Sequence, residues 1–315
     1  MTRFQLFAVS AVQSGAYGKQ PTHRENYRPI SITPILSKVY EKLVFHKQSS
    51  FCDKYGLLPA AQFAYRKFLS CTDALLTIFH HLQKSLDAVM ESYIVQLYFS
   101  AAFDIVSHSG LLLKLKSIDV GGSVVFSCTE FLSDRMQRVM VDGAANEWIK
   151  IISGVPPGSV LGPLLFILYT SEMFELVENR LFSYAYDCTL LAVVRKPADR
   201  SAVAASLNRD LVRIEQWCNH WCMILNPNKT KALAVSGSGT VNPPHGDLVL
   251  SGVSIRAIVP TSTSLEWSVT ASPPSKTMCV VLFHVSLNEL VFWRWWNVYL
   301  WTPQCYFVAI LHLFS

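Results

Sequence analysis

Charged side chains are scarce in this chain of 315 residues: Asp, Glu, Lys and Arg make up 16% of it, whereas hydrophobic residues make up 51%. Disordered chains have the opposite balance, so most of the sequence is expected to fold. The 27 basic and 22 acidic residues leave a net charge of +5, which is compatible with a polyanionic partner but does not require one. The sequence also lacks a glycine-rich Walker loop, a Cys/His knuckle and a Gly-x-Ser-x-Gly elbow, so these three motifs give no indication of its chemistry.

The eight cysteines show no regular spacing, and a chain of 315 residues is too long to need disulfide bonds for stability. We therefore expect a reduced, intracellular protein, although the sequence does not distinguish the nucleus from the cytoplasm. Residues 1–16 imitate a secretory signal only weakly, because they contain one basic residue, Arg3, and no clear cleavage site.

Two uncharged stretches, residues 151–171 and 295–315, are each 21 residues long. A membrane-spanning helix needs about 20 apolar residues, so both stretches raise the question of a membrane. Proline and glycine fill the first half of residues 151–171, which predicts a loop that runs into a short buried helix at 164–169. Residues 295–315 contain Pro303 and His312, and a membrane anchor there is kept only as an alternative to a protein without one.

Apolar residues recur at helical spacing over residues 73–90 and again over 207–221, and residues 92–99 alternate as in a strand. Helices and strands follow one another without a strict βαβ order, which predicts an α+β fold. After residue 276 the only charged side chains are Glu289 and Arg294, a low charge density for a soluble surface.

Six short segments follow one another in a fixed order. They are Asn26–Ser31, Gln62–Lys67, Phe99–His108, Ser153–Pro163, Ser183–Asp187 and Leu225–Lys231. In this order and at these intervals the set resembles the reverse transcriptase domain of non-LTR (LINE-type) retrotransposons. The resemblance covers about residues 20–255, so we expect an unassigned segment at 1–19, a fingers and palm domain at 20–255, and a degenerate apolar tail at 256–315.

The resemblance implies a right-hand polymerase fold with fingers and palm, and no thumb is recognisable after residue 255. It also implies a three-stranded palm sheet whose carboxylates bind two Mg²⁺ ions. In such a site the primer 3′-hydroxyl attacks the α-phosphate of a nucleotide; one metal ion activates the attacking oxygen and the other supports the leaving pyrophosphate. The implied partners are an RNA template, a DNA primer and deoxynucleotides.

The chain departs from the family pattern at the metal-binding positions. Tyr98 stands where the first palm motif has its Asp, and Tyr186 replaces the first Asp of the Tyr-Ala-Asp-Asp motif, so that Asp187 remains. A phenol has a pKa near 10, is neutral at pH 7 and offers one weak oxygen, so it cannot replace a carboxylate as a ligand of Mg²⁺. Asp104 follows six residues after Tyr98, but it is not the primary ligand in the family. We predict a polymerase-like protein that is catalytically defective, and whether any activity remains stays open.

The resemblance also implies nucleotide-binding roles for Arg28, Phe103 and Gly158. Arg28 matches a residue of the fingers that holds the triphosphate, and Phe103 matches the aromatic gate beside the 2′ position of the nucleotide. Gly158 lies in a loop of small residues that lets the backbone approach the nucleotide, although Pro157 replaces the usual Gln there. A solvated arginine at position 28 and a core phenylalanine at position 103 are the alternatives.

Three further basic residues match functional positions of the family. Lys229 matches a lysine proposed to protonate the departing pyrophosphate, and Arg66 and Lys67 match positions along the template–primer channel, where they would neutralise phosphates. A cation in the turn at residues 226–231 is an equally good interpretation of Lys229, and ordinary surface charges are the alternative for Arg66 and Lys67. Two hypotheses therefore remain: a degenerate reverse transcriptase domain, and a non-catalytic nucleic-acid-binding module that kept the basic channel.

Overall fold

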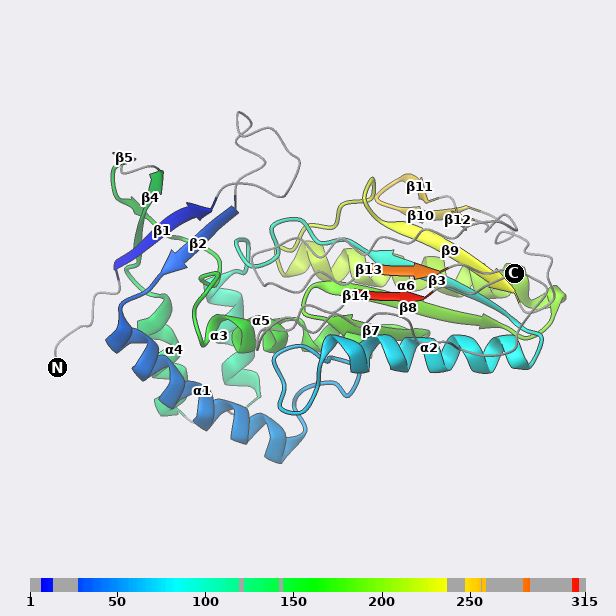
Figure 1. The fold of residues 1–315 in the computed structure, drawn as a ribbon, viewed down its shortest axis with the longest axis horizontal. Helices are drawn as coiled ribbons and strands as arrows, with labels where there is room; N and C mark the ends of the chain where they lie inside the picture. Colours follow the sequence, from blue (N-terminus) through cyan, green and yellow to red (C-terminus); the bar gives the residue numbers. More distant parts are fainter. Residues whose placement is uncertain are drawn as a thin grey trace. The chain divides into compact units, whose positions relative to one another are not determined.

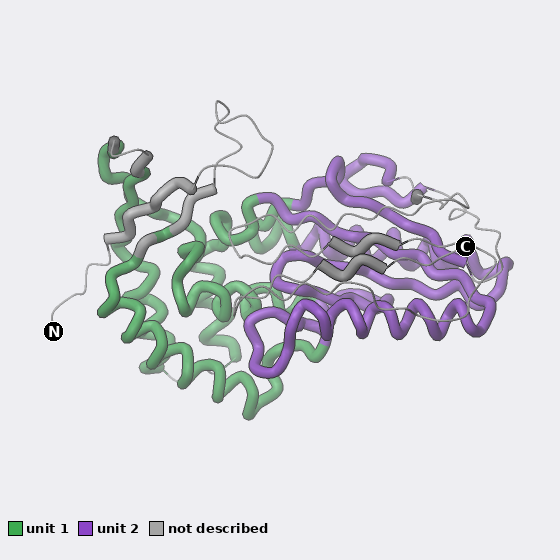
Figure 2. The backbone as a smooth tube through the Cα atoms, in the orientation of Figure 1, with its two compact units in different colours: residues 1–60, 101–173, 218–224 green, residues 61–100, 174–217, 225–315 purple. Residues whose placement is uncertain are grey.

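The computed structural model (Figure 1) describes residues 7–13, 28–118, 122–141, 144–236, 247–255, 257–258, 280–283 and 308–311. The chain divides into two compact units, which have different colours in Figure 2. Unit 1 is assembled from residues 1–60, 101–173 and 218–224, and unit 2 from residues 61–100, 174–217 and 225–315. Each unit therefore combines stretches that lie far apart in the sequence.

Unit 1 combines helices with one sheet of short strands. Its helices are α1 (Ile35–Tyr55), α3 (His108–Ser117), α4 (Gly122–Leu132) and α5 (Gly162–Tyr169), and the 3₁₀ helix η2 (Ser171–Glu175) begins at its last residues. Its strands are β1 (Phe7–Gln13), β2 (Arg28–Ile32), β4 (Met136–Val141), β5 (Ala144–Ala145) and β6 (Ile149–Lys150). The sheet has the order β2-β1-β4-β5, with β6 paired to β4.

Helices α1 and α5 bury different kinds of side chain in unit 1. Every residue of α5 except Pro163 is buried, in agreement with the short buried helix that the sequence predicts at residues 164–169. Helix α1 instead buries the polar residues Ser37, Glu41 and Gln48 together with Val44 and Cys52. Two of these polar side chains are paired: the carboxylate of Glu41 accepts a hydrogen bond of 3.0 Å from the Ser37 hydroxyl.

Unit 2 is built on a five-stranded sheet in the order β12-β9-β3-β8-β7. The strands of this sheet are β3 (Glu91–Leu97), β7 (Arg180–Tyr184), β8 (Asp187–Val194), β9 (Lys231–Ser236) and β12 (Ala257–Ile258). Two two-stranded sheets accompany it, formed by β10 (Leu248–Leu250) with β11 (Val253–Ile255) and by β13 (Val280–Phe283) with β14 (Val308–Leu311). Its helices are α2 (Cys71–Asp87), the 3₁₀ helix η3 (Pro197–Asp199) and α6 (Arg200–His220), whose last three residues belong to unit 1. The expectation of three palm strands is therefore wrong, because β9 and β12 extend the sheet beyond β3.

Helices α2 and α6 run beside this sheet (Figure 1). One face carries Ile94 of β3 and Leu191 of β8, which form a core cluster with Leu82 of α2. Alternation along the strands directs Val95 and its partner Leu190 to the opposite face, and both are fully buried. Helix α6 buries the apolar residues Leu207, Leu211 and Ile214.

An ion pair joins the start of α6 to the start of β3. Arg200 donates two hydrogen bonds to the carboxylate of Glu91, at 2.9 and 2.5 Å. The bidentate geometry fixes both groups, because the planar guanidinium matches the two carboxylate oxygens.

The predicted helices and strand are present with shifted ends. Helix α2 occupies residues 71–87 instead of 73–90, α6 occupies 200–220 instead of 207–221, and β3 ends at Leu97 instead of residue 99. In the part of the chain that the structure describes, no helix is long and apolar enough to cross a membrane. The predicted segment at 1–19 and the tail at 256–315 lie mostly outside the described residues.

Candidate active site

The first palm motif and the Tyr-Ala-Tyr-Asp motif meet at one end of the sheet in unit 2. Strands β3 and β8 are antiparallel, and their last register pair joins Leu97 to Cys188. Tyr98 follows Leu97 directly, and Asp187 precedes Cys188 directly, so both residues lie at the same end of this strand pair. The structure therefore brings together the first and third palm motifs as the sequence predicted.

Tyr186 lies in the tight turn that connects β7 to β8. The register pairs Tyr184 with Asp187, so Ala185 and Tyr186 form the two central residues of the hairpin. Ala185 has a φ of 59°, a left-handed conformation that favours glycine. A non-glycine residue with this backbone is strained, and such strain is held in place only by the surrounding contacts. The position and direction of Tyr186 and Asp187 therefore depend on what fixes this turn.

Asp187, the one carboxylate of the family pattern that this chain keeps, has an unusual electrostatic environment. Burial raises its pKa from 3.8 to about 7, because low-dielectric surroundings disfavour the charged form. Tyr65 of the fingers motif belongs to the same surroundings: burial raises the pKa of its phenol, and the neighbouring Tyr186, Tyr184 and Asp187 raise it further. The region around Asp187 is thus rich in phenols, which are neutral at pH 7.

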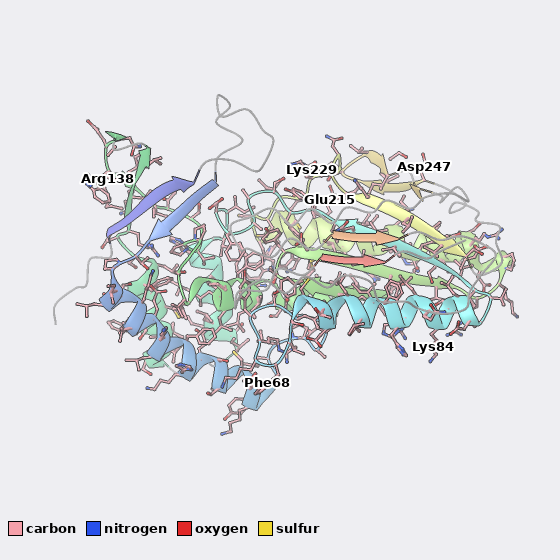
Figure 3. All side chains as sticks on the ribbon, in the orientation of Figure 1. Phe68, Lys84, Arg138, Glu215, Lys229 and Asp247 are labelled. Atoms are coloured by element: carbon pink, nitrogen blue, oxygen red, sulfur yellow. The ribbon has the colours of Figure 1, made fainter. Side chains whose placement is uncertain are left out.

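Lys229 lies beside Tyr98. Its Nζ atom is 4.7 Å from the centre of the Tyr98 ring, within the range of a cation–π interaction. The loop before β9 is held there by the backbone, because the amide of Asn226 donates a hydrogen bond of 2.8 Å to the Tyr98 carbonyl. The Lys229 side chain itself, which is labelled in Figure 3, is exposed. A carboxylate at position 98 would give this ammonium group an ion-pair partner, whereas the phenol gives it a ring face.

The residues at this end of the sheet do not form a carboxylate cluster. Among the described residues, the structure contains no group of three or more His, Cys, Asp or Glu side chains that could hold a metal ion. Asp187 contributes one carboxylate, and the two neighbouring family positions contribute the phenols of Tyr98 and Tyr186. A pair of Mg²⁺ ions needs several hard oxygen ligands on fixed carboxylates, so the donor set in this chain does not fit it.

Phe103 and Gly158 lie in unit 1. Phe103 is half-buried and stacks on Phe166 of α5, with ring centres 4.6 Å apart and planes 17° apart. This contact gives Phe103 a packing role, and it does not test a role at the nucleotide. Gly158 has a φ of 92°, so this position requires the conformational freedom of glycine.

The loop that contains Gly158 is attached to the second half of the first palm motif within unit 1. The amides of Gly154 and Val155 donate hydrogen bonds of 2.8 Å to the carbonyls of Val106 and Phe103. Gly154 is required here, because a Cβ atom would lie 2.6 Å from the carbonyl oxygen of Asp104. The carbonyl of Pro157 accepts a hydrogen bond of 2.9 Å from the amide of Ser31 in β2.

Arg28, Arg66 and Lys67 have different surroundings. Arg28 is the first residue of β2, and its side chain is outside the described part of the chain. Arg66 is half-buried and its Nη1 atom donates a hydrogen bond of 3.2 Å to the Gln62 carbonyl, whereas Lys67 is exposed. The structure therefore gives Arg66 a local structural contact and leaves Lys67 accessible to a ligand.

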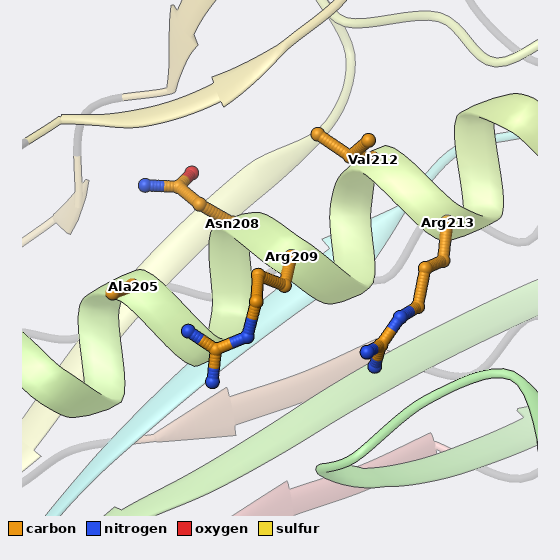
Figure 4. Close-up of a pocket in the computed structure, with 5 residues that line it drawn as sticks. All are labelled: Ala205, Asn208, Arg209, Val212 and Arg213. Atoms are coloured by element: carbon orange, nitrogen blue, oxygen red, sulfur yellow. The ribbon is translucent and has the colours of Figure 1, made fainter.

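A shallow pocket elsewhere in unit 2 does not contain any of the predicted site residues. It has a volume of about 480 Å³ (Figure 4) and is lined by Ala205, Asn208, Arg209, Val212 and Arg213, all on α6. Both arginines form ion pairs of 2.9 Å with Glu178. Arg213 also lies 3.5 Å from the carboxylate of Asp210. No carboxylate is among the lining residues, so this pocket is not a candidate for the metal-dependent chemistry that the motifs suggest.

A family model described as reverse transcriptase (RNA-dependent DNA polymerase) matches residues 18–267. The chain belongs to this family. The reverse transcriptase domain has curated relatives in Drosophila melanogaster: it is 30% identical over 230 residues to the RNA-directed DNA polymerase from mobile element jockey, and 29% identical over 221 residues to the probable RNA-directed DNA polymerase from transposon BS. These matches cover 70% and 68% of this chain but 25% and 24% of the relatives, so the chain spans about a quarter of their length. The chain is thus a reverse transcriptase-like domain of retrotransposon origin, and jockey-type relatives fit the non-LTR class.

Two telomerases are among the solved structures with a similar fold. The apo telomerase of Candida tropicalis, truncated from its C-terminal domain, superposes with a TM-score of 0.51 and 13% identity, covering 73% of this chain and 50% of that one. The telomerase of Candida albicans, in complex with a fragment of telomeric RNA, gives a TM-score of 0.50 and 14% identity, covering 81% and 45%. At these identities the likeness shows the fold, which confirms the predicted fingers and palm architecture of the reverse transcriptase domain.

Two buried polar residues were missed by the sequence analysis. Gln62 belongs to the fingers motif and is fully buried, and its side chain contacts the turn at Ala185. Glu41 is also fully buried, and its carboxylate accepts hydrogen bonds of 2.7 and 3.2 Å from the amides of Val160 and Leu161. The position of Gln62 within a recognised motif was an available signal, whereas nothing in the sequence around Glu41 indicates its partners.

Proposed function

We propose that this chain is the fingers and palm of a retrotransposon reverse transcriptase in which metal-dependent nucleotide transfer is lost. The observation that carries the proposal is the presence of Tyr98 and Tyr186 at the end of the β3–β8 pair, beside the single carboxylate of Asp187. The proposed domain covers residues 20–255. Its relatives act as RNA-directed DNA polymerases, so the proposed ligands are an RNA template, a DNA primer and deoxynucleotides.

The loss follows from the chemistry of the ligands. Each Mg²⁺ ion of a two-metal site needs charged oxygen ligands, and a neutral phenol neither balances nor orients the ion. Metal catalysis contributes several kcal/mol to such a step, and every 1.36 kcal/mol corresponds to a factor of ten. Nucleotide transfer by this chain is therefore expected to be slower than in an intact site by about three orders of magnitude or more.

A primer-extension assay on an RNA template tests the proposal. The natural chain is compared with Tyr98→Asp, with Tyr186→Asp and with the double variant, each with Mg²⁺ and then with Mn²⁺. We expect the double variant to extend the primer and the natural chain to give no synthesis above background. The single variants are expected to remain close to background, because each still lacks one of the family's carboxylates.

Asp187→Asn in the double variant is the control for this assay. If the restored synthesis uses the carboxylates at the end of β3 and β8, this third change abolishes it. Extension by the natural chain at the rate of the double variant would contradict the proposal, and so would a double variant that binds primer–template but remains inactive with both metal ions.

A second candidate function is nucleic-acid binding without catalysis. The observation that favours it is the exposed pair Lys67 and Phe68, which combines a basic side chain with an accessible aromatic ring. Single-stranded nucleic acids are bound by this combination, because the cation neutralises phosphate and the ring stacks on a base. The salt dependence of binding to primer–template distinguishes this function from a chain that has lost all activity.

A further inference from the structure

The side chain of Gln62 makes hydrogen bonds to the end of β7 and to Ala185, the first central residue of the hairpin turn that leads to Tyr186 and Asp187. Its Oε1 atom accepts hydrogen bonds from the amides of Ala64 and Ala185, at 3.0 and 3.1 Å. Its Nε2 atom donates to the Ser183 hydroxyl at 2.6 Å and to the Ala185 carbonyl at 3.3 Å. Both polar atoms of the amide are therefore used twice, and the side chain is fully buried.

The backbone on either side of Gln62 is also hydrogen-bonded to β7. Strand β7 is the last strand of its sheet, and the segment before α2 lies along this edge. The amide of Phe63 donates to the Ser183 carbonyl at 3.0 Å, and the amide of Ser183 donates to the Ala61 carbonyl at 2.9 Å. These bonds hold the Gln62 side chain opposite the turn, where it can reach both polar groups of Ala185.

The turn needs such support because its backbone is strained. Ala185 has a φ of 59°, which for a residue with a Cβ atom costs about 1 kcal/mol or more. A carboxamide has separate donor and acceptor atoms, so it can accept from the amide and donate to the carbonyl of one residue at the same time. A buried polar network in which every member is satisfied fixes one geometry, whereas a partly satisfied one does not.

We propose that Gln62 is a positioning residue that fixes the Ala185–Tyr186 turn and thereby sets the direction of residues 186 and 187. This proposal deepens the function proposed above and rests on it for its catalytic consequence. Supporting residues behind metal ligands typically change metal affinity or activity by 10- to 100-fold when they are altered. We therefore expect Gln62 to control the metal requirement of a palm whose carboxylates have been restored.

The first arm of the test measures hydrogen exchange and does not require polymerase activity. In the natural chain, Gln62→Met keeps the side-chain length but removes all four hydrogen bonds, and Gln62→Glu keeps the two acceptor bonds and loses the two donor bonds. Amide hydrogen exchange at Ala185 is measured on protein with labelled alanine. We expect exchange at Ala185 to accelerate at least tenfold in Gln62→Met, and less in Gln62→Glu. Unchanged protection in both variants would overturn the proposal.

The second arm uses the Tyr98→Asp, Tyr186→Asp protein and measures primer extension as a function of Mg²⁺ concentration. Adding Gln62→Met is expected to lower kcat by 10- to 100-fold and to raise the Mg²⁺ concentration at half-maximal rate, with little change in the KM for primer–template. Gln62→Glu is expected to retain part of the activity. If kcat and the Mg²⁺ requirement stay unchanged in both variants, Gln62 does not position the site.

Asp210→Asn is the matched control, because Asp210 is another fully buried polar residue of unit 2 whose side chain binds backbone amides. Its carboxylate accepts hydrogen bonds from the amides of Glu178 and Asn179, at 2.8 and 3.0 Å, just before β7 begins and thus at the far end of β7 from the turn. This variant is expected to lower stability without altering the Mg²⁺ requirement. A double variant without any polymerase activity would count against the proposed function, and the hydrogen-exchange arm would still decide the role of Gln62.

Discussion

Phe68 has a side chain that is 100% exposed, and its backbone lies in the left-handed region at a φ of 62°. A residue with a Cβ atom loses about 1 kcal/mol or more in this conformation, and an exposed ring gains nothing from burial. We therefore expect Phe68→Gly to raise the free energy of unfolding by about 1 kcal/mol, as measured by urea denaturation. Phe68→Ala is the control, since it removes the ring but keeps the Cβ atom; an equal gain from both variants would contradict the backbone explanation.

At the scale of single residues, the motifs of the palm predicted which side chains lie close together in the fold. The resemblance implied that the first and third palm motifs lie on one sheet, and the register places Tyr98 and Asp187 at the same end of the β3–β8 pair. Glu41 shows the limit of this reasoning. It lies between Lys38 and Lys42 and reads as a surface charge, yet its partners Val160 and Leu161 are about 120 residues away in the sequence. Hydrogen bonds across such separations depend on the completed fold.

Helix α2 begins with a reciprocal capping box. The Ser70 hydroxyl accepts from the amide of Asp73 at 3.3 Å, and the Asp73 carboxylate accepts from the amide of Ser70 at 2.7 Å. The Ser70 hydroxyl also donates to this carboxylate, and these bonds hold the pKa of Asp73 below its usual value. We expect Ser70→Ala to lower the free energy of unfolding by about 1 kcal/mol at pH 7.

The same cap predicts a pH dependence. Because folding depresses the pKa of Asp73, the contribution of its carboxylate is present above about pH 4 and is lost as the pH falls through the lower, folded-state value. The difference in unfolding free energy between the natural chain and Asp73→Asn should therefore shrink on acidification from pH 7 to pH 3. A difference that stays constant over this range would show that the charge of Asp73 does not stabilise the helix.

At the scale of elements, strong periodicity predicted that a helix or strand is present, but it did not predict the residues at which the element begins and ends. Helix α2 starts two residues before the predicted position because Ser70 supplies the cap, and β3 ends at Leu97 because the backbone of Tyr98 bonds to Asn226 instead of β8. Helix α1 shows why hydrophobicity could not reveal its buried face. It buries Glu41 and Gln48, while Ile35 and Leu36 are 80% and 72% exposed.

At the scale of the whole molecule, the exposed Lys67 is a candidate contact for a bound polyanion. If the chain binds primer–template, affinity should fall as salt rises, because bound phosphates release counterions. We expect Lys67→Ala to weaken binding without regard to sequence and to reduce the slope of log K against log[salt] by about 1, as measured by fluorescence anisotropy. Lys84, an exposed lysine in the last turn of α2, provides a control in Lys84→Ala. Equal slopes for the natural chain and Lys67→Ala would exclude Lys67 as a phosphate contact.

The general architecture was predictable because the motifs occur in the order of a known fold. The division into two units was not, because each unit joins three stretches and the chain leaves and re-enters both of them. The number of strands in the main sheet also escaped prediction, since β9 and β12, at residues 231–236 and 257–258, join it by pairing with strands that are distant in the sequence or with each other. Tertiary pairing, and not local pattern, decides these features.

The rate ratio between two proteins tests the central claim most directly. It is the rate of nucleotide incorporation on an RNA template by the Tyr98→Asp, Tyr186→Asp protein divided by that of the natural chain, at equal primer–template occupancy. We predict a ratio of about 1,000 or more, because only the substituted protein offers the metal ions carboxylates at positions 98 and 186 in addition to Asp187. A ratio near one, with both proteins active, would contradict the account.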